Sequence, residues 1–192
     1  MREAVKQSLL ENKAVQENQR RLTEHIRSSG LHMRNEIPSD GNCLFHAIAD
    51  QLERLGEKGL NHSDLRKLSV ETLRNGVPGI SNDDISSFVP NNDLDTYLTN
   101  MSKDRTWGDH IVLVALANAL EKTIRVVTSH EGDCYEVVVE TKNQQGAPIL
   151  LGHLSENHYV SLEPEADKTT KAEGIPADSI AINPPCISYI KR

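Results

Sequence analysis

The order of apolar patterns along the chain is the feature that most constrains its fold. Residues 43–52 and 111–117 are apolar around most of a helical circumference, which is typical of buried helices. After residue 122 the pattern changes to short runs rich in β-branched residues, which predict strands at 123–128, 135–141, 148–154 and 158–162. Helices first and a meander of short strands last predict an α+β domain, with a sheet packed against helices.

Four helices besides the one at 43–52 are expected. The first, at 1–27, carries a thin apolar face and ends at Ser28-Ser29-Gly30, so it either lies on the domain or projects from it. The other three each follow a residue that can cap a helix. They are 64–75 after Ser63, 93–104 after Asn92, and 110–121 after Asp109.

The chain divides into three parts. Residues 1–29 form the N-terminal helix, and residues 30–165 contain all the strong helix and strand patterns. Residues 166–192 are polar, contain Pro184-Pro185 and have little periodicity, so we expect a tail or linker with a short strand at 186–190.

Composition excludes several classes of function. The net charge is −7 and no Lys/Arg cluster is dense enough to neutralise a run of phosphates, so we expect no nucleic-acid partner. No apolar run approaches the roughly 18 residues that would span a bilayer, and the polar N-terminus is unlike a secretory signal. Three widely spaced cysteines predict neither a disulfide framework nor a zinc site. We therefore expect a monomer in the reducing cytoplasm, the nucleus remaining an alternative, with no metal and no cofactor.

Cys43 is the most informative position for chemistry. The turn-forming segment 36–42 runs directly into the apolar helix, so the thiol is expected in the first helical turn. Unpaired backbone N–H groups and the positive end of the helix dipole stabilise a thiolate there. The N–H groups of Gly41, Asn42 and Cys43 are candidates for an oxyanion hole. A cysteine at a helix start is more often a small buried hydrophobe, so this placement alone does not establish catalysis.

A thiolate peptidase also needs a base, and histidine suits that role near neutral pH. His153 and His158 both lie in the strand region, and the residues alone leave both open. His158 is favoured because it begins an alternating strand and would stand at a strand end facing a cleft. His46 lies on the buried helix, where packing is expected. The remaining histidines lie in polar helix ends or loops: His25, His32, His62, His110 and His130.

Three motifs give the chain a resemblance to a known family. Residues 40–45, Asp-Gly-Asn-Cys-Leu-Phe, resemble the nucleophile motif of the ovarian-tumour (OTU) peptidases. Residues 107–110, Trp-Gly-Asp-His, with the apolar helix and the strand 124–127 that follow, are similar to the family's middle segment. Residues 157–162, Asn-His-Tyr-Val-Ser-Leu, are similar to its terminal histidine motif. The motifs stand in the family's order.

The resemblance implies a papain-like cysteine peptidase fold with a small central, mostly antiparallel sheet packed between helices. It implies a deubiquitinase that hydrolyses isopeptide or peptide bonds after the C-terminal glycine of ubiquitin, so the expected partner is ubiquitin or polyubiquitin. On matching positions, Cys43 is the nucleophile, His158 the general base and acid, and Asp40 the third catalytic residue. The alternative for Asp40 is an Asx turn. Trp107 either packs beside the cleft and contacts substrate, or belongs to the core.

One position departs from the family pattern. Val160 stands two residues after the histidine, where many members have an Asn or Asp that orients the imidazole. Residues i and i+2 share a strand face, so Asn157 points away from the face of His158. The orienting group must therefore come from another part of the chain. Some family members take it from a segment before the nucleophile, so the resemblance implies residues 35–40, with Asp40 preferred to Glu36 and Asn35 because the family marks that position. A backbone carbonyl or a water molecule is the further alternative.

The N-terminal helix carries a second, weaker resemblance. Ala4, Ser8 and Glu11 follow Met1 with the spacing of the core of a ubiquitin-interacting motif, although the acidic run expected before it is absent. Ala4 and Ser8 are therefore candidate ubiquitin contacts. Such short patterns also arise by chance on polar helices, and a structural or dispensable helix is the preferred interpretation.

Two other functions compete with an active deubiquitinase. One is an OTU fold that binds ubiquitin but cleaves it poorly, with Val160 as a sign of decay. The presence of both Cys43 and His158 argues against it. The other is the same chemistry on a different ubiquitin-like modifier.

Overall fold

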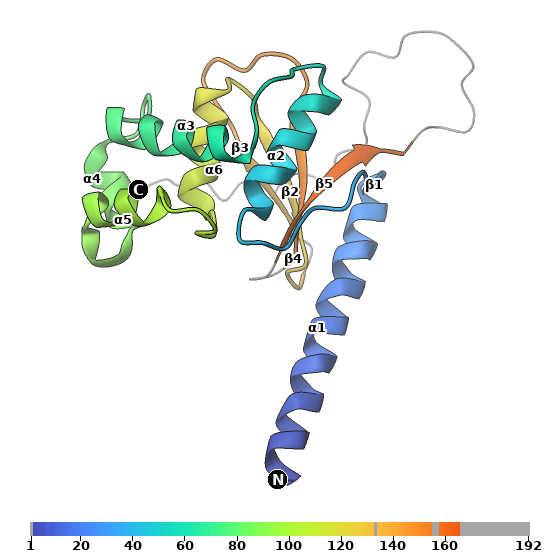
Figure 1. Cartoon of the computed structure of the whole chain (residues 1–192). Coiled ribbons are helices and arrows are strands. Elements are labelled where there is room, and N and C mark those ends of the chain that lie inside the picture. The colour runs from blue at the N-terminus through green and yellow to red at the C-terminus, as the bar shows by residue number, and fades with distance from the viewer. Residues whose placement is uncertain (1, 133, 155–157, 166–192) are drawn as a thin grey trace, which may run out of the picture.

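The centre of the structure is a five-stranded sheet in the order β1-β5-β4-β2-β3 (Figure 1). The structure is a computed structural model that describes residues 2–132, 134–154 and 158–165. Antiparallel pairs join β1 to β5, β5 to β4 and β2 to β3, whereas β2 and β4 run parallel. The sheet is thus mixed and mostly antiparallel, as the resemblance implied. The strands are β1 (Leu31–Met33), β2 (Ile124–Thr128), β3 (Glu136–Val139), β4 (Ile149–Leu154) and β5 (His158–Pro164).

The strand order departs from the predicted meander in two places. β3 forms one edge, and the chain then crosses to the other side of β2, where β4 pairs parallel to it. The opposite edge is β1, which was not predicted because three residues show no readable alternation. Its pairing with residues 162–164 joins opposite ends of the domain. The strand predicted at 186–190, like the whole tail 166–192, lies outside the described residues.

Helices cover both faces of the sheet. α2 (Cys43–Arg54) and α6 (His110–Ala119) belong to a large aliphatic cluster on one face. α1 (Arg2–Ser28) packs on the other face through a smaller cluster. Alternate residues of a strand point to opposite faces, so Leu151 joins the first cluster and its neighbour Leu150 joins the second. The expected placement of the sheet between helices is confirmed.

The two halves of α1 differ in their surroundings. In the C-terminal half, Leu22 and Ile26 are buried, and His25 Nδ1 lies 2.7 Å from a carbonyl oxygen of β2. The N-terminal half runs away from the domain in Figure 1, and Leu9 there is 58% exposed. The helix predicted at 1–27 therefore lies on the domain with one half and projects from it with the other.

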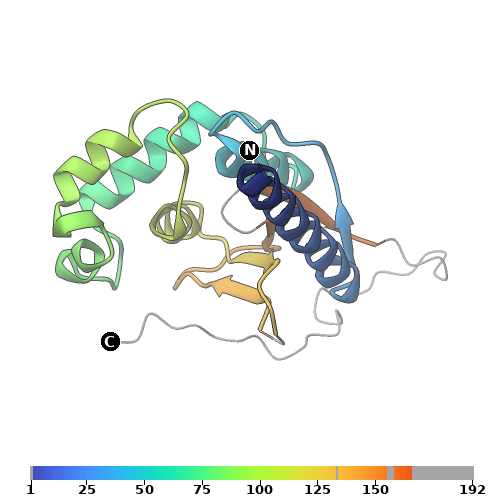
Figure 2. The same ribbon diagram turned by 90° about the horizontal axis from the view of Figure 1, so that it is seen from below.

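A helical lobe lies beside the sheet, on the side away from α1 in both Figure 1 and Figure 2. Its longest helix is α3 (His62–Asn75). The predicted cap Ser63 is wrong, because the Asn61 side chain accepts from the first-turn amides and the Asp64 carboxylate accepts from the Asn61 N–H. This reciprocal capping box satisfies donors that a lone Ser63 cap would leave open.

The rest of the lobe differs from prediction by small shifts. α5 (Leu94–Met101) is capped by Asp93 rather than by the predicted Asn92. Asn92 has a φ of 55° and closes the short 3₁₀ turn η1 (Pro90–Asn92) instead. α4 (Asn82–Ser87) was not predicted, because six residues make fewer than two turns and leave no readable period.

The cysteines and the helices bear on the expected environment. Cys43 is a free, buried thiol. Cys134 is disulfide-bonded, so the expectation of no disulfide is wrong for that residue. Within the described part of the chain, no helix is both long enough and apolar enough to cross a membrane.

Candidate active site

Cys43 is the first residue of α2 and is only 7% exposed. Two residues earlier, Gly41 has a φ of 85°, and a side-chain carbon there would collide with the carbonyl oxygen of Arg105. Only glycine fits this turn. The Asn42 N–H donates to the Asp40 carboxylate at 2.9 Å, which forms an Asx turn. The Asx turn therefore places the thiol in the first helical turn of a buried helix, as the sequence predicted.

The candidate oxyanion donors are reduced from three to two. The Asn42 N–H is already engaged by Asp40, so it is not available to a developing oxyanion. The N–H of Cys43 lies in the first helical turn, where no intrahelical acceptor exists. Among the described residues, neither that group nor the Gly41 N–H has an acceptor. Gly41 and Cys43 therefore remain as candidates.

His158 begins β5 and lines the same cavity as Cys43. Its Nδ1 lies 3.2 Å from the hydroxyl oxygen of Ser39, and the backbone carbonyl of Ile37 also accepts a hydrogen bond from the ring. Burial lowers the pKa of His158 below its ordinary value, although the bond to Ile37 acts in the opposite direction. The imidazole is thus neutral at pH 7, with one nitrogen held by the segment that leads to Cys43.

Asp40 does not hold His158, which corrects its expected role. One carboxylate oxygen accepts from the Asn42 N–H, and the other lies 3.3 Å from Nε2 of His46. Desolvation raises the pKa of Asp40, but the hydrogen bonds from Asn42 and His46 outweigh it and the net pKa is lowered. Asp40 is therefore an ionised residue of the Asx turn, the alternative that the sequence left open.

The segment that orients His158 was predicted correctly, but its residues were not. Within 35–40, Ser39 and the carbonyl of Ile37 make the contacts, whereas the sequence predicts an Asp40, Glu36 or Asn35 side chain and gives a backbone carbonyl only as a further alternative. Neither residue carries a charge that would single it out in a sequence. Val160 packs against the cluster beneath α1, in agreement with its having no orienting role. Asn157 lies outside the described residues.

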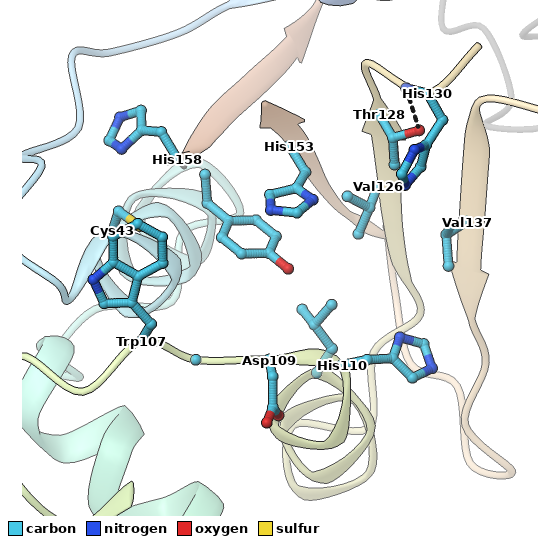
Figure 3. A pocket seen from close by; sticks show the side chains of 13 residues that line it. Cys43, Trp107, Asp109, His110, Val126, Thr128, His130, Val137, His153 and His158 are labelled. Carbon is cyan, nitrogen blue, oxygen red and sulfur yellow. Dashed lines mark hydrogen bonds between the residues drawn. The ribbon is translucent and has the colours of Figure 1, made fainter. Parts of the chain in front are cut away.

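A cavity of about 380 Å³ opens beside Cys43 and His158 (Figure 3). Trp107 lines it and is 55% exposed, so the interpretation of Trp107 as a core residue is wrong. Asp109 also lines the cavity and caps α6 as predicted, accepting from two first-turn amides. The exposed indole stands at the cavity wall, where it can contact a bound chain.

His153, the alternative base, lies on the same side of the cavity as His158. Its ring stacks on Tyr159, with centroids 4.2 Å apart. Burial, with repulsion from His130 and His158, lowers the pKa of His153 to about 4. His153 is therefore a neutral wall residue. The contacts of His158 with the nucleophile segment make His158 the better candidate for the base.

Two histidines expected in solvated positions also line the cavity. They are His110 and His130, and burial lowers the pKa of His110 although Asp109 opposes the shift. Across the described residues, no group of three or more His, Cys, Asp or Glu side chains is arranged to hold a metal ion.

The candidate contacts on α1 lie apart from this site. Ser8 is exposed on the half of the helix that projects from the domain. The side chain of Ala4 is not described. The structure therefore does not bring Ser8 together with Cys43 and His158.

Comparisons with known proteins agree with this arrangement. The family model described as OTU-like cysteine protease matches residues 38–162, which include both Cys43 and His158. A deubiquitinating enzyme of Arabidopsis thaliana, OVARIAN TUMOR DOMAIN-containing deubiquitinating enzyme 10, is 35% identical over 65% of this chain. The match spans 32% of that longer protein.

Solved structures share the fold at low sequence identity. The OTU domain of OTUD1 superposes with a TM-score of 0.60 and 19% identity, covering 79% of this chain and 99% of that one. An OTU deubiquitinase from Wolbachia pipientis wMel, solved bound to ubiquitin, gives a TM-score of 0.56 at 14% identity over 71% of this chain and 97% of that one. With its fold, its motifs and the match across residues 38–162, the chain belongs to the OTU-like cysteine protease family.

Proposed function

We propose that the chain is a thiol-dependent deubiquitinase, with Cys43 as nucleophile and His158 as general base and acid. The observation that carries the proposal is the shared cavity of the two side chains, with Nδ1 of His158 in hydrogen-bond contact with the Ser39 hydroxyl. Family membership and the names of the relatives support ubiquitin as the substrate. Because the chain spans only about a third of the first of these relatives, activity and partners are proposals for this protein.

The geometry suggests a two-step acyl transfer. With Nδ1 held by Ser39, Nε2 of the neutral His158 takes the proton of the Cys43 thiol. The thiolate attacks the carbonyl carbon of the C-terminal glycine, and the N–H groups of Gly41 and Cys43 bind the oxyanion. The imidazolium then donates its proton to the leaving amine, and a thioester remains. His158 activates a water molecule, which hydrolyses the thioester and releases the thiol and the carboxylate.

The cavity also suggests where the substrate lies. Trp107 is exposed beside Cys43, and we assign it a packing contact with the C-terminal residues of ubiquitin. The neutral imidazole and phenol rings of His153 and Tyr159 form the opposite wall. A ubiquitin contact at Ala4 and Ser8, a cytoplasmic location and a monomeric state stay predictions of the sequence.

A C-terminal electrophile tests the proposal and its rivals together. Ubiquitin carrying such an electrophile is expected to form a covalent adduct with the wild-type chain and none with Cys43→Ser, as followed by intact mass. A probe built on another ubiquitin-like modifier is expected to react far more slowly. No adduct with ubiquitin, or an adduct that persists in Cys43→Ser, would contradict the assignment. Adduct formation without turnover of di-ubiquitin would favour the binding module.

A further inference from the structure

A buried arginine, Arg66, contacts the turn at residues 40–43, which we call the nucleophile turn. Arg66 of α3 is 4% exposed, and its guanidinium donates to Asn42 Oδ1 at 2.5 Å and to the carbonyl oxygens of Thr106 at 2.7 Å and Met101 at 3.0 Å. Its Cζ atom lies 4.2 Å from the ring centroid of Phe45. Burying a cation is costly, and an apolar side chain of similar volume often gives equal or greater stability. The contacts of Arg66 therefore point to a geometric role.

The acceptors of Arg66 belong to two segments that pack against each other. Besides the close approach of Gly41 to Arg105, a side-chain carbon on Gly108 would lie 2.5 Å from a methyl carbon of Leu44. Residues 102–108, which follow α5, thus run along the nucleophile turn. We call them the Trp107 loop, because they include Trp107, the single tryptophan of the chain.

The Asn42 side chain connects the two segments. Its Oδ1 accepts from Arg66 and from the Arg105 N–H at 3.2 Å, and its Nδ2 donates to Asp104 at 3.0 Å. Asn42 is 1% exposed, so its amide is satisfied by protein groups on both sides. No apolar side chain at position 66 could supply donors to Asn42 Oδ1, to the Met101 carbonyl at the end of α5 and to the Thr106 carbonyl in the loop.

We propose that Arg66 is a positioning residue that holds the Trp107 loop against the nucleophile turn, with Asn42 as the connecting side chain. The proposal rests on the proposed function, because it assigns to this loop the wall that receives the substrate tail. Cys43 itself is held mainly by the packing of α2, in which Leu44 and Phe45 are fully buried. Loss of Arg66 should therefore displace Trp107 more than it displaces the thiol.

The experiment compares two reactions of the same sulfur. Labelling by the ubiquitin electrophile needs the cavity wall, whereas alkylation by iodoacetamide needs only an accessible thiolate. In Arg66→Met we expect the first rate to fall on the order of 10- to 100-fold and the second to change less than about twofold. Arg66→Lys keeps the charge but cannot reach three acceptors in a fixed fork, so it should give an intermediate loss. The quenching of Trp107 fluorescence by acrylamide should likewise change most in Arg66→Met and less in Arg66→Lys.

The matched control is Arg54→Met. Arg54 lies in α2, at the end of the helix away from Cys43; it is partly buried and donates to Gln51 and to the carbonyl of Pro148. The Arg54→Met variant should have a lower thermal stability. Its ratio of ubiquitin-electrophile labelling to iodoacetamide alkylation, and its Trp107 quenching, should match wild type. Equal changes in both arginine variants, or a wild-type ratio in Arg66→Met, would overturn the proposal. Should Arg66→Met not fold, Arg66→Lys alone decides by the same two readouts. A wild-type chain inert to the ubiquitin electrophile would refute the proposed function, and the Trp107 quenching would still test the loop.

Discussion

The two walls of the cavity are built on different physical principles. The helix-side wall, formed by residues 40–43 and the loop 102–108, is held by directed hydrogen bonds that meet at Asn42. The strand-side wall carries His153, His158 and Tyr159, whose side chains are partly or largely buried and make few hydrogen bonds in the described structure. Ser39 and Ile37, in the segment that leads into the helix-side wall, contact His158 and so connect the two walls.

Hydrogen bonds and burial therefore have separate effects on the site: the hydrogen bonds restrict the orientation of Cys43, and burial affects the protonation of His158. A nucleophile must meet a carbonyl carbon at a defined angle, and directed bonds around its turn restrict that angle. A base must be unprotonated at neutral pH, and desolvation favours this state by lowering the pKa of His158, the proposed base. Changes in the strand-side wall should therefore alter pH dependence, whereas changes at the contacts between the walls should alter turnover.

The largest expected effect concerns the strand-side wall and pH. The pKa of His153 is about 4 in the folded chain against 6.5 for the free side chain, so the unfolded chain takes up the proton first as the pH falls. The stability due to neutral His153 is thus complete above pH 6.5 and is lost between 6.5 and 4, at most about 3 kcal/mol. In His153→Phe this loss should be absent.

Urea unfolding at pH 7, 5.5 and 4.5 measures the effect. Tyr159→Phe is the matched control, because it keeps the ring that stacks on His153 and removes no group that titrates between pH 7 and 4.5. It should keep the wild-type dependence on pH. Parallel curves for wild type and His153→Phe would show that solvent reaches the His153 ring and that burial does not set its charge.

The second prediction separates Ser39 from Asp40. Ser39→Ala removes one hydrogen bond to His158 from an exposed residue, so kcat/KM should fall about 3- to 10-fold at an unchanged Tm. Asp40→Ala removes the acceptor of the Asx turn and should lower both kcat/KM and Tm. Asp40→Asn keeps an acceptor and should retain more of each. The distinction between the walls fails if Asp40→Ala lowers kcat/KM with no loss of Tm while Ser39→Ala leaves kcat/KM unchanged.

The smallest effect is expected far from both walls. Deleting residues 1–14 removes only the projecting half of α1 and leaves Leu22 and Ile26 in place. Stability should change by less than about 0.5 kcal/mol, and cleavage of a minimal ubiquitin substrate should be unchanged. Tetra-ubiquitin serves as the second substrate. A selective loss on tetra-ubiquitin would instead assign a ubiquitin contact to the region of Ala4 and Ser8.

Sequence patterns predicted the local structure next to the site, although they misplaced the caps of α3 and α5 by one or two residues. The turn before Cys43 and the cap at Asp109 depend on residues only a few positions apart, and both are present. The partner of His158 depends on a contact across 119 residues, which no local period encodes. Arg66 is a charged residue in an amphipathic helix and would be placed at the surface by pattern alone. Only its acceptors in two other segments explain its burial.

The position of β5 has a consequence for biosynthesis. Cys43 lies near the start of the family domain, whereas His158 lies on its last described strand, which is inserted between β1 and β4. Domains tend to fold as units during translation. A growing chain that has not yet emerged as far as residues 158–164 thus carries Cys43 without His158. Under the proposed function, such an unfinished chain would not act on ubiquitin attached to itself or to its neighbours on the ribosome.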